Sequence, residues 1–199
     1  MRIFYFMGKS AAGKDTIYEN IKKLMPYLKT VILYTTRPMR QGEENGKEYY
    51  FVSETDLKKA KEKGQIVESR TYQTTAGPWT YYTLDDGQID KESDNGYLMI
   101  GTLQSYMDIR SFYGSDQVIP IYISANDGIR LERAIAREQL QKNPDYKEVC
   151  RRFLADSNDF SEENLEKAGI AKQYDNIDLR KCLSLIREDI EDLQTNIRP

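Results

Sequence analysis

The 199-residue chain is long enough for one α/β domain with a well-buried core, and its 39% hydrophobic and 31% charged residues are typical of a globular protein. Its 29 basic against 32 acidic residues argue against general nucleic-acid binding, and the absence of histidine excludes Ser-His-Asp hydrolysis and histidine-ligated metal centres. Two cysteines, no long apolar run and no signal-peptide pattern lead us to expect a cytoplasmic protein with free thiols and no membrane partner.

The chain opens with a strand, a loop and a helix. Its first seven residues, MRIFYFM, predict a buried strand, and a loop of small residues over 8–14 follows. Apolar residues then recur at helical spacing from Ile17 to Leu24, and Pro26 ends the predicted helix.

Apolar runs separated by polar turns predict further strands at 31–34, 49–52, 97–100 and 118–124. Residues 65–96 alternate short β-like pieces with turns. Helices are expected over 57–63 behind a capping box of Ser53 and Asp56, from Asn126 or Asp127 to about Leu140, over about 146–156, and along a final apolar stripe over 179–193. Alternating strands and helices indicate an α/β fold with a mostly parallel sheet.

The loop after the first strand carries the most informative pattern. Residues 8–14 match G-x-x-x-x-G-K between a strand and a helix, although a glycine-rich turn with an exposed lysine is the alternative. Glycines let backbone N–H groups surround a phosphate, the helix N-terminus adds partial positive charge, and Lys14 can bridge the β- and γ-phosphates. We therefore predict an ATP-binding loop made of Gly8, Lys9, Ser10, Ala11, Ala12, Gly13, Lys14, Asp15 and Thr16.

Asp15 stands where this motif has a serine or threonine that binds Mg²⁺. Mg²⁺ takes oxygen ligands, so the carboxylate could hold the metal directly or through water; it could instead repel the phosphates. We expect Asp15 to be the metal residue for Mg²⁺ bound with ATP, and Thr16 to contact the α-phosphate through its hydroxyl.

A second cluster of phosphate-binding residue types follows in TTRPMRQGEENGKEYYFVS, residues 35–53. Arg37 and Arg40 lie three residues apart, and Tyr49 comes nine residues later. Arginine forks suit a phosphate, and a tyrosine hydroxyl can complete its cradle. Taken alone, the stretch could equally be a solvated charged loop.

With the preceding loop, this stretch resembles the guanylate kinase family, whose pattern TTR-x-x-R-x-G-E-x-x-G-x-x-Y-x-F-V-S is met almost throughout. The resemblance implies a P-loop NTPase-type parallel sheet flanked by helices, and transfer of the γ-phosphate of Mg-ATP to GMP and dGMP. Arg37, Arg40 and Tyr49 would hold the acceptor phosphate. The implied domains are a core over 1–32, 97–126 and 166–199, a nucleoside-monophosphate-binding insertion over 33–96, and an arginine-bearing lid over 127–165.

The same resemblance assigns residues near the two bases. Glu68 would read guanine, because a carboxylate can accept from the adjacent N1–H and N2–H₂ donors. Tyr81 and Thr83 would lie near the acceptor phosphate and base, and Asn176 near the adenine of ATP. Carboxylates that the family carries at one strand end are absent from 100–102, so base selectivity stays open.

Arginines recur on the next expected helix. Arg130, Arg133 and Arg137 share one face, and the last two have no acidic residue three or four positions away. Like charges along one face of a helix repel one another unless an anion lies between them, and a phosphoryl group in transfer is such an anion. Alternatively, these arginines form a solvated helix face. The resemblance implies that Arg133, Arg137 and Arg152 are lid arginines that act in catalysis together with Lys14.

Two other functions remain open. Because the acidic residues at the strand end are missing, the protein could be a kinase for a different nucleotide or small phosphorylated acceptor. A screen of acceptors would distinguish this function from a kinase for GMP. A non-catalytic interaction module is the second alternative; the intact Lys14 and the lid arginines argue against it, and absence of Mg-ATP binding would favour it. The sequence does not indicate the oligomeric state.

Overall fold

The computed structural model describes residues 1–74 and 77–195, so 75–76, within the β-like stretch, and 196–199 lie outside the described part. The larger of two β-sheets is fully parallel, with the strand order β2-β7-β1-β8-β9. Its strands are β2 (Lys29–Thr30), β7 (Gly96–Ile100), β1 (Arg2–Met7), β8 (Val118–Ser124) and β9 (Gln173–Asp175). The predicted α/β class is confirmed.

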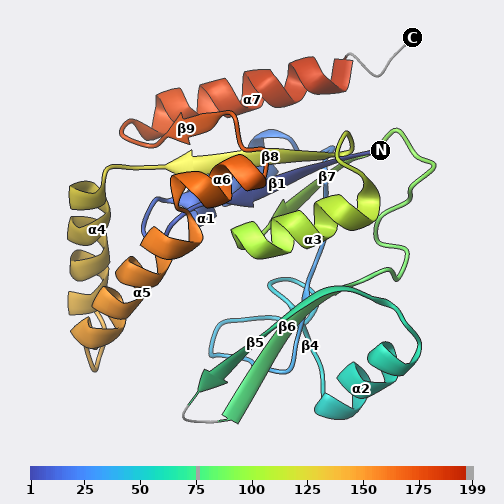
Figure 1. The fold of residues 1–199 in the computed structure, drawn as a ribbon, viewed down its shortest axis with the longest axis horizontal. Helices are drawn as coiled ribbons and strands as arrows, with labels where there is room; N and C mark the ends of the chain where they lie inside the picture. The colour runs from blue at the N-terminus through green and yellow to red at the C-terminus, as the bar shows by residue number, and fades with distance from the viewer. Residues whose placement is uncertain (75–76, 196–199) are drawn as a thin grey trace.

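β1 lies at the centre of this sheet and is buried on both faces. Phe4 and Phe6 pack into one core layer, whereas Ile3, Tyr5 and Met7 pack into the other. Helices cover both faces (Figure 1): α1 (Lys14–Leu24) and α7 (Leu179–Thr195) on one, α3 (Leu103–Tyr113) and α6 (Glu162–Lys167) on the other. Burial on both sides explains why the opening strand is almost entirely apolar.

The second sheet lies apart from the first and has the strand order β4-β3-β6-β5 (Figure 1). β3 pairs parallel with β4 and antiparallel with β6, and β5 and β6 form an antiparallel hairpin. The elements of this part are β3 (Tyr34–Thr35), β4 (Tyr50–Phe51), α2 (Glu54–Glu62), β5 (Ile66–Thr74) and β6 (Gly77–Leu84). The predicted capping box is confirmed, because Ser53 and Asp56 each accept a hydrogen bond from the other's backbone N–H.

The prediction of a single strand at 31–34 is wrong. The chain pairs with the larger sheet at β2 and with the second sheet at β3, and residues 31–33 connect the two. The side chain of Gln88 bonds both the N–H and the C=O of Ile32, so this backbone has a side-chain partner in place of a strand. Val31 and Leu33 are apolar because they are buried in the core.

Helices α4 (Asp127–Gln139) and α5 (Tyr146–Asp159) lie side by side beyond one end of the larger sheet (Figure 1). Both were expected, and Asn126 caps α4 by accepting a hydrogen bond from the Gly128 N–H. Sequence reasoning missed α3, α6 and β9. Within the described residues no helix is both long and apolar enough to span a membrane.

Candidate functional site

The loop between β1 and α1 has a backbone that its small residues make possible. Gly13 has φ 93° and Ala11 has φ 62°; Ala11 is the one non-glycine residue with positive φ in the described chain. A Cβ on Gly8 would lie 2.4 Å from the Ile123 carbonyl oxygen, and one on Gly13 would lie 2.2 Å from Nδ2 of Asn176. The left-handed Ala11 costs about 1 kcal/mol, a strain that folded proteins concentrate at functional sites.

Asn176 and Arg133 hold this loop from outside. Asn176 is 5% exposed, and its Nδ2 donates to the Ala12 carbonyl oxygen at 2.8 Å. Arg133 donates to the backbone oxygen of Asn176 at 3.0 Å and contacts the Ala12 oxygen at 3.5 Å. The structure thus brings both predicted residues to the loop, and Arg133 bonds neutral carbonyl groups there.

Lys14 and Asp15 begin α1 and contact each other. The Lys14 ammonium lies 2.9 Å from Asp15 Oδ2, with the two side chains 25% and 77% exposed. Exposed ion pairs of this kind contribute little free energy to stability. The Lys14 ammonium can therefore leave Asp15 and bind a phosphate group at little cost. Thr16, also in the first turn, is exposed.

A cavity of about 640 Å³ gathers four of the predicted residues. Ser10 of the loop, Arg40 and the α4–α5 residues Arg137 and Arg152 all line it. Arg152 donates to Glu148 at 2.7 Å, whereas in the described chain neither Arg40 nor Arg137 has a carboxylate within ion-pair distance. Glu138 and Glu148 also line the cavity, but Arg40 and Arg137 are not in ion pairs with them, so two guanidinium groups beside the glycine-containing loop have no direct partner in the described chain.

Arg37 is already paired with a carboxylate. Its two terminal nitrogens donate to both oxygens of Glu43 at 3.0 and 2.8 Å, and Arg37 is 3% exposed. This contact holds the pKa of Glu43 below its usual value. The rings of Tyr49 and Phe51 lie 5.6 and 5.4 Å from the guanidinium carbon, and Tyr81 packs edge-on against Tyr49. The predicted phosphate cradle thus contains a carboxylate from the same stretch.

Glu68 is buried beside an arginine that sequence reasoning missed. Thr83 donates to its Oε1 at 2.8 Å, and Arg70 Nε lies 3.5 Å from its Oε2. Burial raises the pKa of Glu68, and Arg70 and Thr83 oppose that rise. Arg70 also donates to Oγ of Ser105 at 2.8 Å and to Thr102 at 3.1 Å. Its place two residues after Glu68 in a strand was the available signal.

Arg130 does not join the arginine stripe in the way its spacing predicts. It is 1% exposed, and its terminal nitrogens donate to Asp127 at 2.6 Å and to Asp156 at 3.0 Å. The protein therefore supplies the anions for this arginine itself. Asp127, three residues earlier, was a readable signal, whereas Asp156 comes from another helix.

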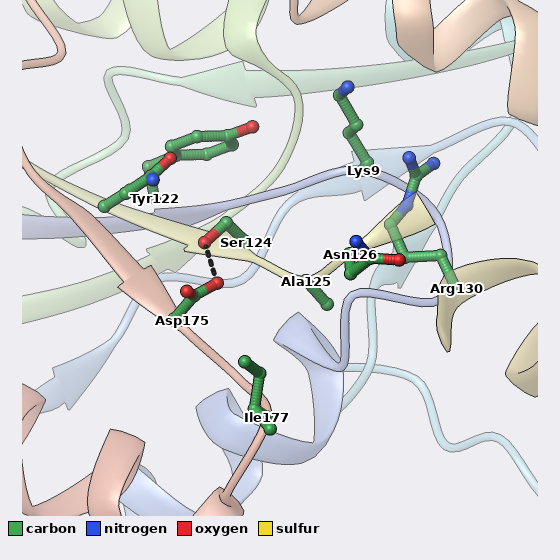
Figure 2. A pocket seen from close by; sticks show the side chains of 9 residues that line it. Lys9, Tyr122, Ser124, Ala125, Asn126, Arg130, Asp175 and Ile177 are labelled. Carbon is green, nitrogen blue, oxygen red and sulfur yellow. Dashed lines mark hydrogen bonds between the residues drawn. The ribbon is translucent and has the colours of Figure 1, made fainter. Parts of the chain in front are cut away.

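A second cavity, of about 380 Å³, opens at the ends of β8 and β9. Figure 2 shows Lys9 and Arg130 at one side of it, and the hydrogen bond from Ser124 to Asp175, 2.9 Å long, at the other. Across the described ranges there is no cluster of three or more acidic or cysteine side chains that could hold a metal ion.

Together these features define an α/β protein whose central parallel strand leads through a strained, glycine-containing loop into a helix, next to an arginine-lined cavity. The family model described as guanylate kinase matches residues 1–161. The chain belongs to the guanylate kinase family, as its motifs predicted.

Individual guanylate kinases match this chain either at low sequence identity or over short segments. The guanylate kinase of Salinibacter ruber is 26% identical over 149 residues, which are 72% of this chain and 77% of that protein. Those of Lactobacillus acidophilus and Geobacter metallireducens are 43% and 36% identical over 67 and 66 residues, 33% of this chain in each case. These two matches span only about a third (32%) of each relative's length.

The fold has a solved counterpart. The crystal structure of guanylate kinase from Anaplasma phagocytophilum aligns with 97% of this chain and 86% of its own, with a TM-score of 0.67 and 17% sequence identity. At that identity the likeness supports the fold and carries no residue roles.

Proposed function

We propose that this protein is an ATP-dependent nucleoside monophosphate kinase that transfers the γ-phosphate of Mg-ATP to GMP or dGMP. The observation that carries the proposal is the cavity in which Ser10, Arg40 and Arg137 meet, because it joins the loop to arginines from two other parts of the chain. Phosphoryl transfer needs two phosphorylated ligands held in line and their charge neutralised, which such a cavity supplies.

The roles follow from where the groups lie. The amides of the loop hold the β-phosphate of ATP, and Lys14 leaves Asp15 to bridge the β- and γ-phosphates. Arg40 receives the phosphate of the acceptor, whose oxygen forms the new bond to the γ-phosphorus as the bond to the ADP oxygen breaks. Arg137 and Arg152 neutralise the group in transfer, and the α4–α5 pair excludes water that would hydrolyse ATP.

Mg²⁺ fits the residues present. Asp15 offers an accessible carboxylate in the first turn of α1, and Mg²⁺ in such enzymes is held by one or two carboxylates together with substrate phosphates. When bound with ATP, the ion neutralises charge on the β- and γ-phosphates.

Asp15→Ala is expected to raise the Mg²⁺ concentration for half-maximal activity by about tenfold, or about 1.4 kcal/mol, because it removes the proposed carboxylate ligand without supplying the hydroxyl that the motif usually carries. Titration of Mg²⁺ at fixed ATP measures this shift. Glu19→Ala, on the same helix, is the control and leaves the titration unchanged. An Asp15→Ala variant with the same Mg²⁺ dependence as the parent protein would exclude the metal role.

One observation favours a second candidate, a kinase for another phosphorylated acceptor. Arg70 lies against Glu68 and also bonds Thr102, in the stretch where the family's carboxylates are missing. A guanidinium beside Glu68 reduces the negative potential available to the N–H donors of guanine. A nucleotide base whose edge carries more carbonyl oxygens would suit the Glu68–Arg70 pair better, because those oxygens can accept hydrogen bonds from the guanidinium group.

An ADP-release assay with Mg-ATP against GMP, dGMP, AMP, CMP and UMP separates these candidates. We expect a strong preference for GMP and dGMP. Turnover of another nucleotide instead would keep the phosphoryl chemistry and overturn the base assignment. No turnover with any acceptor, together with no Mg-ATP binding by calorimetry, would support a non-catalytic module.

A further inference from the structure

The side chain of Asp156 reaches from α5 to the backbone of the phosphate loop. Its Oδ2 accepts a hydrogen bond from the Ser10 N–H at 2.7 Å, between residues 146 positions apart in the chain. The same oxygen accepts from Arg130 at 3.0 Å, and the Asp156 side chain is 15% exposed. One carboxylate oxygen therefore joins α5, α4 and the loop.

Arg130 bonds the other side of the same loop residue. Its Nε donates to the Ser10 carbonyl oxygen at 3.1 Å, and its guanidinium lies 4.9 Å from the ring centre of Phe153. Figure 2 shows Arg130 beside the stretch of loop that carries Lys9. Both polar groups of the Ser10 backbone are thus bonded by one buried ion pair between the two helices.

The bond from Asp156 orients the peptide group before Ser10, and the bond from Arg130 orients the one after it. A trans peptide is planar, so the Ala11 N–H points opposite to the Ser10 carbonyl that Arg130 holds. Ala11 is also the residue held at φ 62°. An ion pair that served only to join α4 to α5 would not need to bond the Ser10 backbone. That backbone belongs to the loop in which the orientation of the N–H groups determines phosphate binding.

We propose that Asp156 and Arg130 are positioning residues that tie the α4–α5 pair to the phosphate loop, an inference that rests on the proposed function. They act through Ser10: Asp156 holds its N–H and Arg130 holds its carbonyl oxygen, and together they keep the following Ala11 N–H in the orientation that meets the phosphates of ATP. Through the same contacts they place Arg137 and Arg152 next to the transferring group.

Asp156→Ala tests this directly on the full chain. We expect the Kd for ATP, measured by calorimetry, to rise about tenfold and kcat to fall about tenfold, while the acceptor KM changes less than about twofold. Asp156→Asn keeps an oxygen that can accept from the Ser10 N–H, and it recovers most of the ATP affinity. Asp159→Ala, an exposed carboxylate at the end of the same helix, is the matched control and binds ATP like the parent protein.

Loss of one partner of a buried pair can unfold a protein, so a second route is needed. Arg130→Lys keeps the charge but cannot reach Ser10 and Asp156 in the fork geometry of a guanidinium, and it is expected to weaken ATP binding in the same direction. If Asp156→Ala does not fold, Asp156→Asn and Arg130→Lys decide the question.

Two results with the variants, and one with the parent protein, would overturn the inference. Variants that melt at lower temperature but bind ATP within about twofold of the parent protein would make the pair merely structural. Tighter ATP binding by Asp156→Ala would show that the carboxylate competes with phosphate. A parent protein that binds ATP but phosphorylates no acceptor would refute the proposed function alone, and one that binds no ATP would refute both.

Discussion

We expect Lys14→Ala to lower kcat for the proposed phosphoryl transfer by about 10³-fold, or about 4 kcal/mol of transition-state stabilisation. The ammonium lies at the start of α1, where its charge adds to that of the helix N-terminus, and its ion-pair partner is the exposed Asp15. Because that pair is weak, the charge of Lys14 is available to the phosphates. Steady-state ADP release at saturating acceptor, with ATP varied, measures the loss.

Lys23→Ala provides the matched control, because Lys23 is an exposed lysine in the last turn of the same helix. It is expected to keep kcat within about twofold. If both variants lost activity equally, the effect would come from the stability of α1. If Lys14→Ala kept full activity, the lysine would have no role in transfer.

We expect Arg137→Ala to lower kcat for the proposed reaction by about 10²-fold, or about 2.7 kcal/mol, with a smaller change in the KM of either substrate. No described carboxylate pairs with Arg137, in contrast to Arg130, so its charge is free to meet the transferring phosphoryl group. Its removal also relieves repulsion from Arg133 one turn away, so the melting temperature stays level or rises slightly. Kinetics and thermal unfolding on one preparation measure both effects.

Lys147→Ala is the control for this second variant. It removes a cation from the same pair of helices at an exposed position outside the residues that line the larger cavity. Its kcat is expected to match that of the parent protein. A fall in kcat for Lys147→Ala as large as that for Arg137→Ala would mean that the overall charge of these helices matters rather than one guanidinium.

Most of the correct fold predictions came from patterns of residues that are close together in the sequence. The loop over 8–14, the helix after it and the capping box at Ser53 are each specified by residues close together in the chain, and all three are present. The expected strand at 31–34 failed because burial, and not strand pairing, makes Val31 and Leu33 apolar. β9, with three residues, is too short to show a period.

The site was predictable where one stretch supplies the chemistry and not where distant segments meet. Arg40 and Arg137 were found from spacing, and the structure places both on one cavity. The contacts of Ser10 with Asp156 and of Arg70 with Thr102 join residues 146 and 32 positions apart, and nothing local indicates them. The domain boundaries at 33, 97, 127 and 166 and the roles of the site residues stay predictions.

The contacts of Arg70 have a consequence for the thermodynamics of acceptor binding. This arginine comes from β5 in the second sheet, and it bonds Thr102 and Ser105 at the start of α3, beside the larger sheet. The two sheets are therefore joined by this side chain, which restricts how far they can move relative to each other. Under the proposed function, less conformational entropy would be lost when the acceptor binds, so more of the contact energy would appear as affinity, and we expect release of the diphosphate product to be slow.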